Sequence, residues 1–204
     1  MPQYKLTYFN IMGRGEPIRL IFAQGGIDYE DNRVTGDAWT AFKPSTPFGQ
    51  LPVLEVDGKM LAQSGAICTY LAKQSGLNGK DDWEAAKIQE LNGGVEDLLA
   101  GFRPWFTEKD ETKKKEILEK LTNEKIIPFL DRYEKFLADN GTGFFVGNDV
   151  TQADLNLFHW LGFLAHGICP EPFKKYAELN KFLAKIGGLP KIAAWLEKRP
   201  KTDM

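Results

Sequence analysis

The hydrophobic pattern of the chain changes near residue 80, and this change limits the folds that the sequence can adopt. Before that point, short segments with strand-like alternation are interleaved with segments of helical period, whereas only helical periodicity follows it. We therefore predict two domains, at residues 1–76 and 83–204, joined by a short polar linker at residues 77–82. A chain of 204 residues is long enough for two small domains.

The N-terminal part has the pattern of an α/β domain with a thioredoxin-like order: strand, helix, strand, helix, strand, strand, helix. Asp57-Gly58 between two apolar segments is a strong hairpin signal, and Ser64 is placed as an N-cap before the last helix. The expected strands are 5–9, 28–34, 52–56 and 59–62, and the expected helices are 16–24, 36–43 and a third from residue 64 that stops at Gly76.

The C-terminal part is predicted to be all-helical. Its first helix carries apolar residues at a 3.6-residue period from Ile88 to Phe106. A later helix contains Pro128, where we expect a kink. Thr151 to Asp154 has the pattern of a capping box before an apolar helix, and two shorter helices are expected near 176–186 and 190–198.

Charge and composition exclude several classes of protein. The chain has 26 basic and 28 acidic side chains, a net charge of −2, whereas proteins that follow nucleic-acid phosphates carry a basic excess. The longest uncharged stretch, residues 155–170, is too short and too polar to cross a bilayer, which needs about 20 apolar residues. The first nine residues lack the pattern of a secretory signal. We therefore expect a cytoplasmic protein that binds neither nucleic acid nor a membrane.

The cysteines and histidines do not have the surroundings that redox or metal chemistry needs. Cys68 and Cys169 lie in apolar helical segments, so we expect buried thiols and no disulfide framework. The loop after the first strand lacks the cysteine of a dithiol site. His159 and His166 lie on an apolar helix without a nearby carboxylate pair, which favours core or interface positions over metal binding or acid–base catalysis.

Several short stretches occur in the order and spacing of one family. They are Tyr4–Phe9, Arg14, Trp39 with Lys43, Pro47–Leu54, Val56–Gly58, Gln63–Ser64, Phe145–Asn148 and Lys198–Pro200. Each is weak evidence alone, but the combination is specific and covers nearly the whole chain. On these residues the chain resembles the cytosolic glutathione transferases, and most closely the sigma class, which includes glutathione-dependent prostaglandin D synthases. The resemblance implies the glutathione transferase fold, with glutathione as co-substrate.

The resemblance assigns the activation of glutathione to Tyr8 and Arg14. The Tyr8 hydroxyl would donate a hydrogen bond to the glutathione sulfur and so favour the thiolate. Arg14 would polarise and orient this hydroxyl. From the pattern alone, the simpler interpretation is that Tyr8 alternates with Leu6 in a strand and that Arg14 is a loop arginine in water.

The carboxylates of glutathione need cations or N–H donors. Trp39 and Lys43 are four residues apart, so a helix places the indole N–H and the ammonium on one side, suited to the glycyl carboxylate. An amphipathic helix with a lysine along its surface has the same spacing. Gln63 and Ser64 lie at a helix start, which favours the γ-glutamyl carboxylate, although an ordinary cap explains Ser64 equally well.

The resemblance also implies backbone recognition of the peptide at Gln50, Leu51 and Pro52. In the family, the bond before this proline is cis and turns the preceding backbone, here Leu51, toward the cysteinyl unit. The base rate for such a bond is only about 5%. This prediction therefore depends on the resemblance and not on the spacing.

The first C-terminal helix has a second face that carries glycines and acids: Glu90, Gly93, Gly94, Asp97 and Gly101. Helical glycines cost about 1 kcal/mol each relative to alanine, so we expect close approach by a subunit or a ligand. The resemblance implies a homodimer in which Asp97 reaches the γ-glutamyl amine across the interface; an exposed acidic position is the alternative. The acidic cluster of metal-activated prostaglandin synthases is depleted here, so we expect no metal requirement.

The second substrate is expected between Tyr8 and the helical domain. The residues predicted to bound it are Phe9, Met12, Gly13, Trp105, Phe106 and Lys198, and apolar walls of this kind suit hydrophobic electrophiles. The predicted function is glutathione transfer to such electrophiles, with peroxidase activity on the same thiolate. Two alternatives stay open: glutathione-dependent isomerisation of prostaglandin H to D, and a non-catalytic carrier of large apolar anions.

Overall fold

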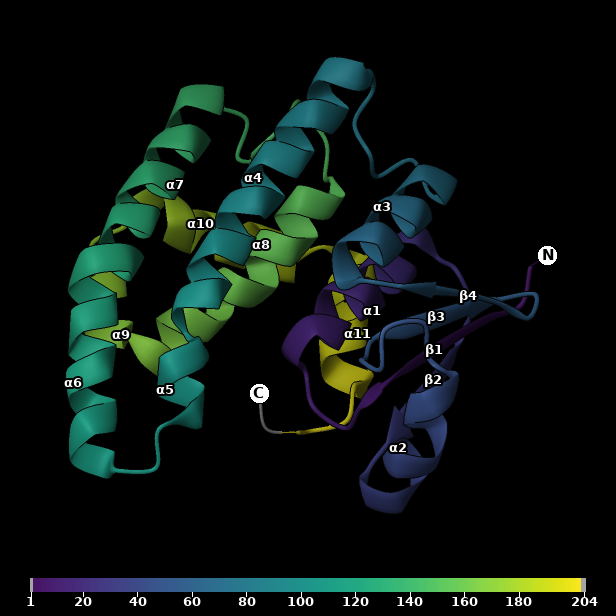
Figure 1. Cartoon of the computed structure of the whole chain (residues 1–204). Coiled ribbons are helices and arrows are strands. Elements are labelled where there is room, and N and C mark those ends of the chain that lie inside the picture. Colours follow the sequence, from purple (N-terminus) through teal and green to yellow (C-terminus); the bar gives the residue numbers. More distant parts are fainter. Residues whose placement is uncertain (1, 203–204) are drawn as a thin grey trace. The chain divides into compact units, whose positions relative to one another are not determined.

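The computed structural model describes residues 2–202, which divide into two compact units (Figure 1). Of the described residues, one unit comprises 2–78 with 187–202, and the other comprises 79–186. The sequence pattern does not indicate that the C-terminal segment belongs to the first unit. The domain boundaries at 1–76, 77–82 and 83–204 stay a prediction.

The first unit is built on a four-stranded mixed sheet with the strand order β2-β1-β3-β4. Its strands are β1 (Tyr4–Phe9), β2 (Glu30–Val34), β3 (Val53–Val56) and β4 (Lys59–Ala62). β1 pairs parallel to β2 and antiparallel to β3, and β3 and β4 form the hairpin predicted at Asp57-Gly58. Both turn residues have positive φ, 49° and 80°, as a tight hairpin of this type requires.

Helices complete the predicted α/β order, which is confirmed. They are α1 (Glu16–Gly25), α2 (Gly36–Phe42), α3 (Ser64–Gln74) and α11 (Pro190–Lys198), with 3₁₀ turns η1 (Gly13–Gly15) and η2 (Lys43–Ser45). α1 packs against both α3 and α11, as Figure 1 shows. One detail was wrong: the N-cap of α3 is Gln63, and Ser64 is the first helical residue.

The second unit is helical, as predicted. Its elements are α4 (Asp82–Gly101), α5 (Arg103–Thr107), α6 (Glu111–Leu121), η3 (Thr122–Ile126), α7 (Ile127–Asn140), α8 (Gln152–Phe163), η4 (Leu164–Ile168), α9 (Pro170–Phe173) and α10 (Ala177–Gly187). The single helix predicted to reach Phe106 was wrong. α4 ends at Gly101, and Pro104, which has no N–H to donate, lies in the first turn of α5.

Pro128 lies inside a continuous helical stretch, as predicted, because α6, η3 and α7 follow one another without a break. The five residues of η3 directly before α7 form a π-helical turn. A proline inside a helix removes one backbone hydrogen bond and clashes with the preceding turn, and a π-helical turn is a common form of the resulting irregularity. The irregularity expected at Pro128 is therefore placed one turn earlier in the chain, where α6 and α7 join.

The start of α8 confirms the predicted capping box. Asp154 accepts hydrogen bonds from the backbone N–H of Thr151 and from its hydroxyl, each at 2.8 Å. A third bond of 2.8 Å comes from the N–H of Phe145. Burial raises the pKa of the Asp154 carboxyl to about 6, because these neutral donors offset only part of the desolvation.

The cysteines and histidines of the helical segments differ in burial. Cys68 and Cys169 are buried and form no disulfide, as predicted. His159 is buried and His166 is exposed, so the prediction of a core or interface position is met in the core for His159, and for His166 only the interface position stays a prediction. Within residues 2–202, no helix combines the length and apolar character needed to cross a membrane.

Candidate active site

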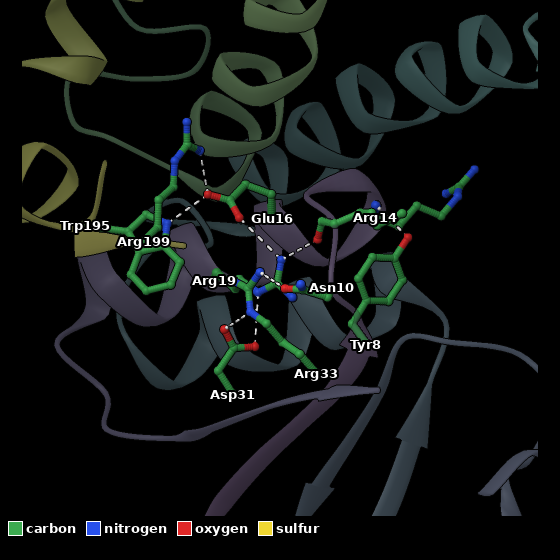
Figure 2. Close-up of polar contacts among 10 residues, drawn as sticks. Tyr8, Asn10, Arg14, Glu16, Arg19, Asp31, Arg33, Trp195 and Arg199 are labelled. Carbon is green, nitrogen blue, oxygen red and sulfur yellow. Dashed lines mark hydrogen bonds and ion pairs between the residues drawn. The ribbon is translucent and has the colours of Figure 1, made fainter. Parts of the chain in front are cut away.

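Tyr8 lies near the end of β1 with its hydroxyl held by the following loop. Its side chain is 6% exposed. The hydroxyl oxygen accepts a hydrogen bond of 3.0 Å from the backbone N–H of Arg14, as Figure 2 shows. A hydroxyl has one hydrogen and two acceptor positions. Tyr8 therefore keeps its own hydrogen to donate to a ligand.

The loop approaches Tyr8 closely because two of its residues are glycines. A Cβ added at Gly15 would lie 2.5 Å from the Tyr8 ring carbon Cδ1, and one at Gly13 would lie 2.7 Å from the Tyr8 hydroxyl oxygen. Gly13 also has a φ of 35°, which disfavours other residues. Any side chain at either position would displace Tyr8 or the loop.

Burial and nearby positive charge shift the pKa of the Tyr8 hydroxyl in opposite directions. Burial raises the pKa of Tyr8 above its usual value. The backbone hydrogen bond from Arg14, followed by the positive charges of Arg14 and Arg19, acts in the lowering direction. Burial outweighs these effects, so the Tyr8 hydroxyl keeps its proton, while the positive charges favour an anion next to it.

Arg14 connects Tyr8 to the start of α3 through both its backbone and its side chain. Its backbone polarises the Tyr8 hydroxyl, while its side chain extends away from the Tyr8 ring (Figure 2). The guanidinium atom Nη1 lies 3.5 Å from the hydroxyl oxygen of Ser64. The first turn of α3 contains no acidic residue, so its N–H groups and this guanidinium favour an anion from outside the chain.

Gln63, directly before α3, has an unusual backbone. Its φ is 72° and its ψ is 114°, a region that L-residues rarely occupy. A non-glycine residue in a sparsely populated region costs about 1–3 kcal/mol, and such residues gather at ligand sites. The Gln63 side chain is exposed. This outlier supports the prediction that Gln63 has a functional position.

Trp39 and Lys43 lie on successive turns, as their spacing predicts. The backbone N–H of Lys43 donates to the carbonyl of Trp39, although α2 ends at Phe42 and Lys43 opens η2. The ring of Phe9 lies 5.6 Å from that of Tyr8 and 5.5 Å from that of Trp39. Phe9 therefore connects Tyr8 with α2 in an aromatic row.

The bond between Leu51 and Pro52 is cis, which confirms the prediction from the resemblance. Pro52 is buried at the start of β3, and Gln50 before it is exposed. Lys43 approaches this loop, because a Cβ added at Gly49 would lie 3.8 Å from Lys43 Cε.

A cluster of buried charges lies behind Tyr8. Glu16, 1% exposed, accepts bonds of 2.8 Å from the Trp195 indole N–H and from Arg199, and the Arg19 guanidinium lies 3.4 Å from its other oxygen. Asp31 pairs with Arg19 at 3.1 Å and with Arg33 at 2.9 Å. Figure 2 shows these side chains between α1, β2 and α11. We call Glu16, Arg19, Asp31, Arg33 and Arg199 the α1 charge cluster.

The α1 charge cluster was not predicted from the sequence. A signal exists in the sequence: Glu16 and Arg19 lie three residues apart in a helix whose neighbours Ile18 and Leu20 are apolar. Charged residues are almost never fully buried unless they are paired. Their partner Arg199 is distant in sequence, so the pairing could not be identified from local pattern.

Other predicted residues of the first unit lie near the loop or on the surface. Met12 accepts two backbone bonds that start α1, from the N–H groups of Gly15 and Glu16. Lys198 is exposed at the end of α11, with its ammonium 5.9 Å from the Trp195 ring centroid.

In the second unit, Trp105 and Phe106 form an aromatic group with buried Phe102. The Trp105 and Phe106 ring centroids are 5.0 Å apart, and each lies 6.1 Å from that of Phe102. Phe106 is 61% exposed. Such an exposed aromatic surface can contact an apolar ligand.

The glycine face of α4 is approached partly from within the chain. A Cβ at Gly94 would lie 2.4 Å from the hydroxyl oxygen of Tyr133, which donates to the Leu91 carbonyl. A Cβ at Gly101 would lie 3.0 Å from Leu121. Gly93, in contrast, has open space, and Asp97 is exposed. At Gly94 and Gly101, side chains of the same chain therefore account for the glycine, and no subunit or ligand is required to explain it.

Comparisons with known proteins agree with this geometry. A family model described as the N-terminal domain of glutathione S-transferase matches residues 4–73, and one described as the C-terminal domain matches residues 96–199. The chain is 43% identical to glutathione S-transferase 1 of Ascaris suum, over 99% of both chains. It is 40% identical to hematopoietic prostaglandin D synthase of Gallus gallus, also over 99% of both. The solved structure of prostaglandin synthase D of Nilaparvata lugens is 38% identical and superposes with a TM-score of 0.90, covering 98% of this chain and all of that one.

Proposed function

Because this chain belongs to the glutathione S-transferase family, we propose that it activates the thiol of glutathione as a thiolate and transfers it to hydrophobic electrophiles. The observation that carries this proposal is the Tyr8 hydroxyl, which accepts the Arg14 N–H at 3.0 Å and can donate to a sulfur. A free thiol has a pKa of about 8.5 and is only a few per cent ionised at neutral pH. Lowering that pKa by about two units would make the thiolate dominant.

The ends of glutathione are assigned to different elements. The γ-glutamyl carboxylate lies at Gln63 and Ser64, where the start of α3 and the Arg14 guanidinium both favour an anion. The glycyl carboxylate lies at Trp39 and Lys43. The backbone at Gln50, Leu51 and Pro52 binds the cysteinyl unit, which a strand edge can do with its free N–H and C=O groups.

For the electrophile we propose the residues that the resemblance and the sequence suggest: Phe9, Met12, Gly13 and Lys198 in the first unit, and Trp105 and Phe106 in the second. The exposed aromatic group around Phe106 supports an apolar substrate. Reduction of hydroperoxides would use the same thiolate.

A second candidate function is glutathione-dependent isomerisation of prostaglandin H to D. The identity of 40% to the Gallus gallus enzyme over nearly the full length favours it. Both reactions begin with the same thiolate, so Tyr8 has the same role in each. We assign the chain to the sigma class on this similarity and on the matching stretches. A carrier role for large apolar anions would not need the Tyr8 hydroxyl.

We further propose a cytoplasmic homodimer that acts in detoxification without a metal. Open space at Gly93 and the exposed carboxylate of Asp97 support an interface on α4, through which Asp97 would reach the γ-glutamyl amine of the partner's glutathione. Sedimentation as a monomer would contradict this part of the proposal. Loss of activity in a chelator would contradict the absence of a metal requirement.

The test of the proposed function is glutathione conjugation to an activated aryl halide, compared between wild type and Tyr8→Phe from about pH 6 to about pH 9, the range that brackets a thiol titration. We expect Tyr8→Phe to bind glutathione in calorimetry but to lose about 10²-fold in rate. Tyr4→Phe is the matched control, since it removes a hydroxyl from the same strand. Failure of the wild type to bind glutathione would refute the proposal. Binding without conjugation would favour the isomerase or carrier.

A further inference from the structure

Arg19 is a buried cation that the mechanism above does not use. Its side chain is 0% exposed, and a guanidinium cannot be deprotonated in a protein. Its Nη1 atom donates a bond of 2.9 Å to the carbonyl of Ile11, and its Nε atom pairs with Asp31 at 3.1 Å. Among the described residues, its buried Nη2 atom has no hydrogen-bond partner. Carboxylates and a loop carbonyl together hold this cation in the interior.

Arg19 contacts both parts of the Tyr8 site. Its guanidinium carbon lies 5.8 Å from the centroid of the Tyr8 ring, over the ring face. The carbonyl that it holds, at Ile11, belongs to the loop whose Arg14 N–H bonds to the Tyr8 hydroxyl. Figure 2 shows the Arg19 guanidinium between Glu16 and Asp31. The position of the Tyr8 hydroxyl and that of its donor therefore depend on the same guanidinium.

The α1 charge cluster has three guanidiniums and two carboxylates. Asp31 has Arg33 at 2.9 Å, and Glu16 has Arg199 at 2.8 Å, so each carboxylate has a partner besides Arg19. The cluster therefore has one positive charge in excess, and Arg19, which shares both carboxylates, is the member of the cluster over the Tyr8 ring. A desolvated cation at a ring face within about 6 Å interacts strongly with it. The cluster thus directs a net positive charge toward Tyr8.

We propose that Arg19 is a positioning residue for the reaction at Tyr8. It fixes the Ile11 carbonyl, and through this loop it fixes the Arg14 amide that bonds to the Tyr8 hydroxyl. It also holds a positive charge at the face of the Tyr8 ring, and this charge favours the thiolate form of glutathione at the Tyr8 hydroxyl. The effect on the sulfur rests on the proposed function; the effect on the loop does not. The other charged groups of the first unit near this site are Arg14 of η1, Glu16 of α1, Asp31 and Arg33 of β2, and Arg199 after α11.

The experiment compares Arg19→Met and Arg19→Lys with wild type. Two quantities are measured: the pKa of the bound glutathione thiol, from thiolate absorbance against pH, and the hydrogen-exchange rate of the Arg14 amide without glutathione. In Arg19→Met we expect the thiol pKa to rise by about one unit, a tenfold loss of thiolate, and the Arg14 amide to exchange at least about tenfold faster than amides of α3. Arg19→Lys keeps the charge and should recover part of the thiol pKa.

Two further variants make the test decisive. Arg19→Met with Glu16→Gln removes one charge of each sign and also the buried carboxylate that loses its Arg19 contact, and it serves if the single variant does not fold; it should show the same two changes. Arg199→Met is the matched control, because it also removes a guanidinium that pairs with Glu16, but one that lies away from the Tyr8 ring. It should raise the pKa of the glutathione thiol by less than a third of the rise in Arg19→Met. An unchanged thiol pKa and Arg14 exchange in the folded double variant, or an equal shift in Arg199→Met, would overturn the proposal. If wild type does not bind glutathione, the proposed function fails, and the Arg14 exchange alone decides the role of Arg19.

Discussion

Two buried carboxylates, one in each unit, lie in the first turns of helices but have opposite surroundings. Glu16 in α1 faces the guanidiniums of Arg19 and Arg199. Asp154 in α8 accepts hydrogen bonds from neutral groups, namely backbone N–H groups and the Thr151 hydroxyl, and within residues 2–202 no ion pair to it is found. Hydrogen bonds from neutral groups can fix a carboxylate in place, but a nearby cation offsets more of the free-energy cost of removing its charge from water. The difference teaches that Asp154 has a structural role, whereas Glu16 organises charge near Tyr8.

The largest effect is expected from removing the structural carboxylate. Asp154→Ala leaves the buried N–H groups of Phe145 and Thr151 without their acceptor, and each unsatisfied donor costs about 1–3 kcal/mol. We expect the free energy of unfolding of the second unit to fall by about 4 kcal/mol in urea titrations. The protein that remains folded should bind glutathione with unchanged affinity, because the hydrogen bonds of Asp154 go to Phe145 and Thr151 and to none of the residues proposed to contact glutathione. A loss below about 1 kcal/mol would mean that water replaces the carboxylate.

The next prediction concerns the charge of Asp154. Its folded pKa of about 6 lies above the usual value of 3.8, so the folded state holds the proton more tightly than the unfolded state between these values. Stability should therefore fall as pH rises from about 4 to about 6, by up to about 3 kcal/mol, and then stay level. Unfolding free energies of wild type and Asp154→Asn across this range measure it, because the variant lacks the titration. Parallel curves would show that the three hydrogen bonds compensate the charge, as cations do at Glu16.

Glu16→Gln tests the other half of the comparison. Glutamine keeps an oxygen for the Trp195 and Arg199 donors but removes the charge opposite two guanidiniums. We expect a loss of about 2 kcal/mol in the stability of the first unit, with little dependence on salt because the pair is buried. Lys5→Gln, which removes the exposed ion pair to Glu30, is the control and should cost less than about 0.5 kcal/mol. Equal effects of the two variants would remove the distinction between buried charge pairs and surface ones.

The sequence predicts much of the fold because most elements follow from local signals. The hairpin at Asp57-Gly58 and the capping box at Thr151 are examples, since each depends on residues within a few positions. The α1 charge cluster could not be predicted in this way. The bonds of Glu16 to Trp195 and Arg199 span 179 and 183 positions.

The candidate site shows the same division between local and distant causes. The roles of Tyr8 and the cis Leu51–Pro52 bond came from resemblance to a family, because single residues carry no periodic signal. Two of the α4 glycines, Gly94 and Gly101, are closely approached, but by Tyr133 and Leu121 of the same chain, which local pattern could not identify. Local pattern therefore predicts which elements form, and distant packing decides what surrounds each site residue.

The start of α3 extends the comparison to a third helix, and it gives the smallest expected effect on stability. α1 and α8 have their own carboxylates in the first turn, but α3 has none, which fits a site kept for the γ-glutamyl carboxylate. Gly65 is exposed and a Cβ there meets no atom within 4 Å, so Gly65→Asp adds an internal carboxylate without a clash. We expect it to stabilise the protein without glutathione by about 0.5 kcal/mol. It should also weaken glutathione binding about tenfold in calorimetry, because two anions then compete for one helix terminus. Gly65→Asn is the uncharged control, and equal affinities of the two variants would show that the anion of glutathione binds elsewhere.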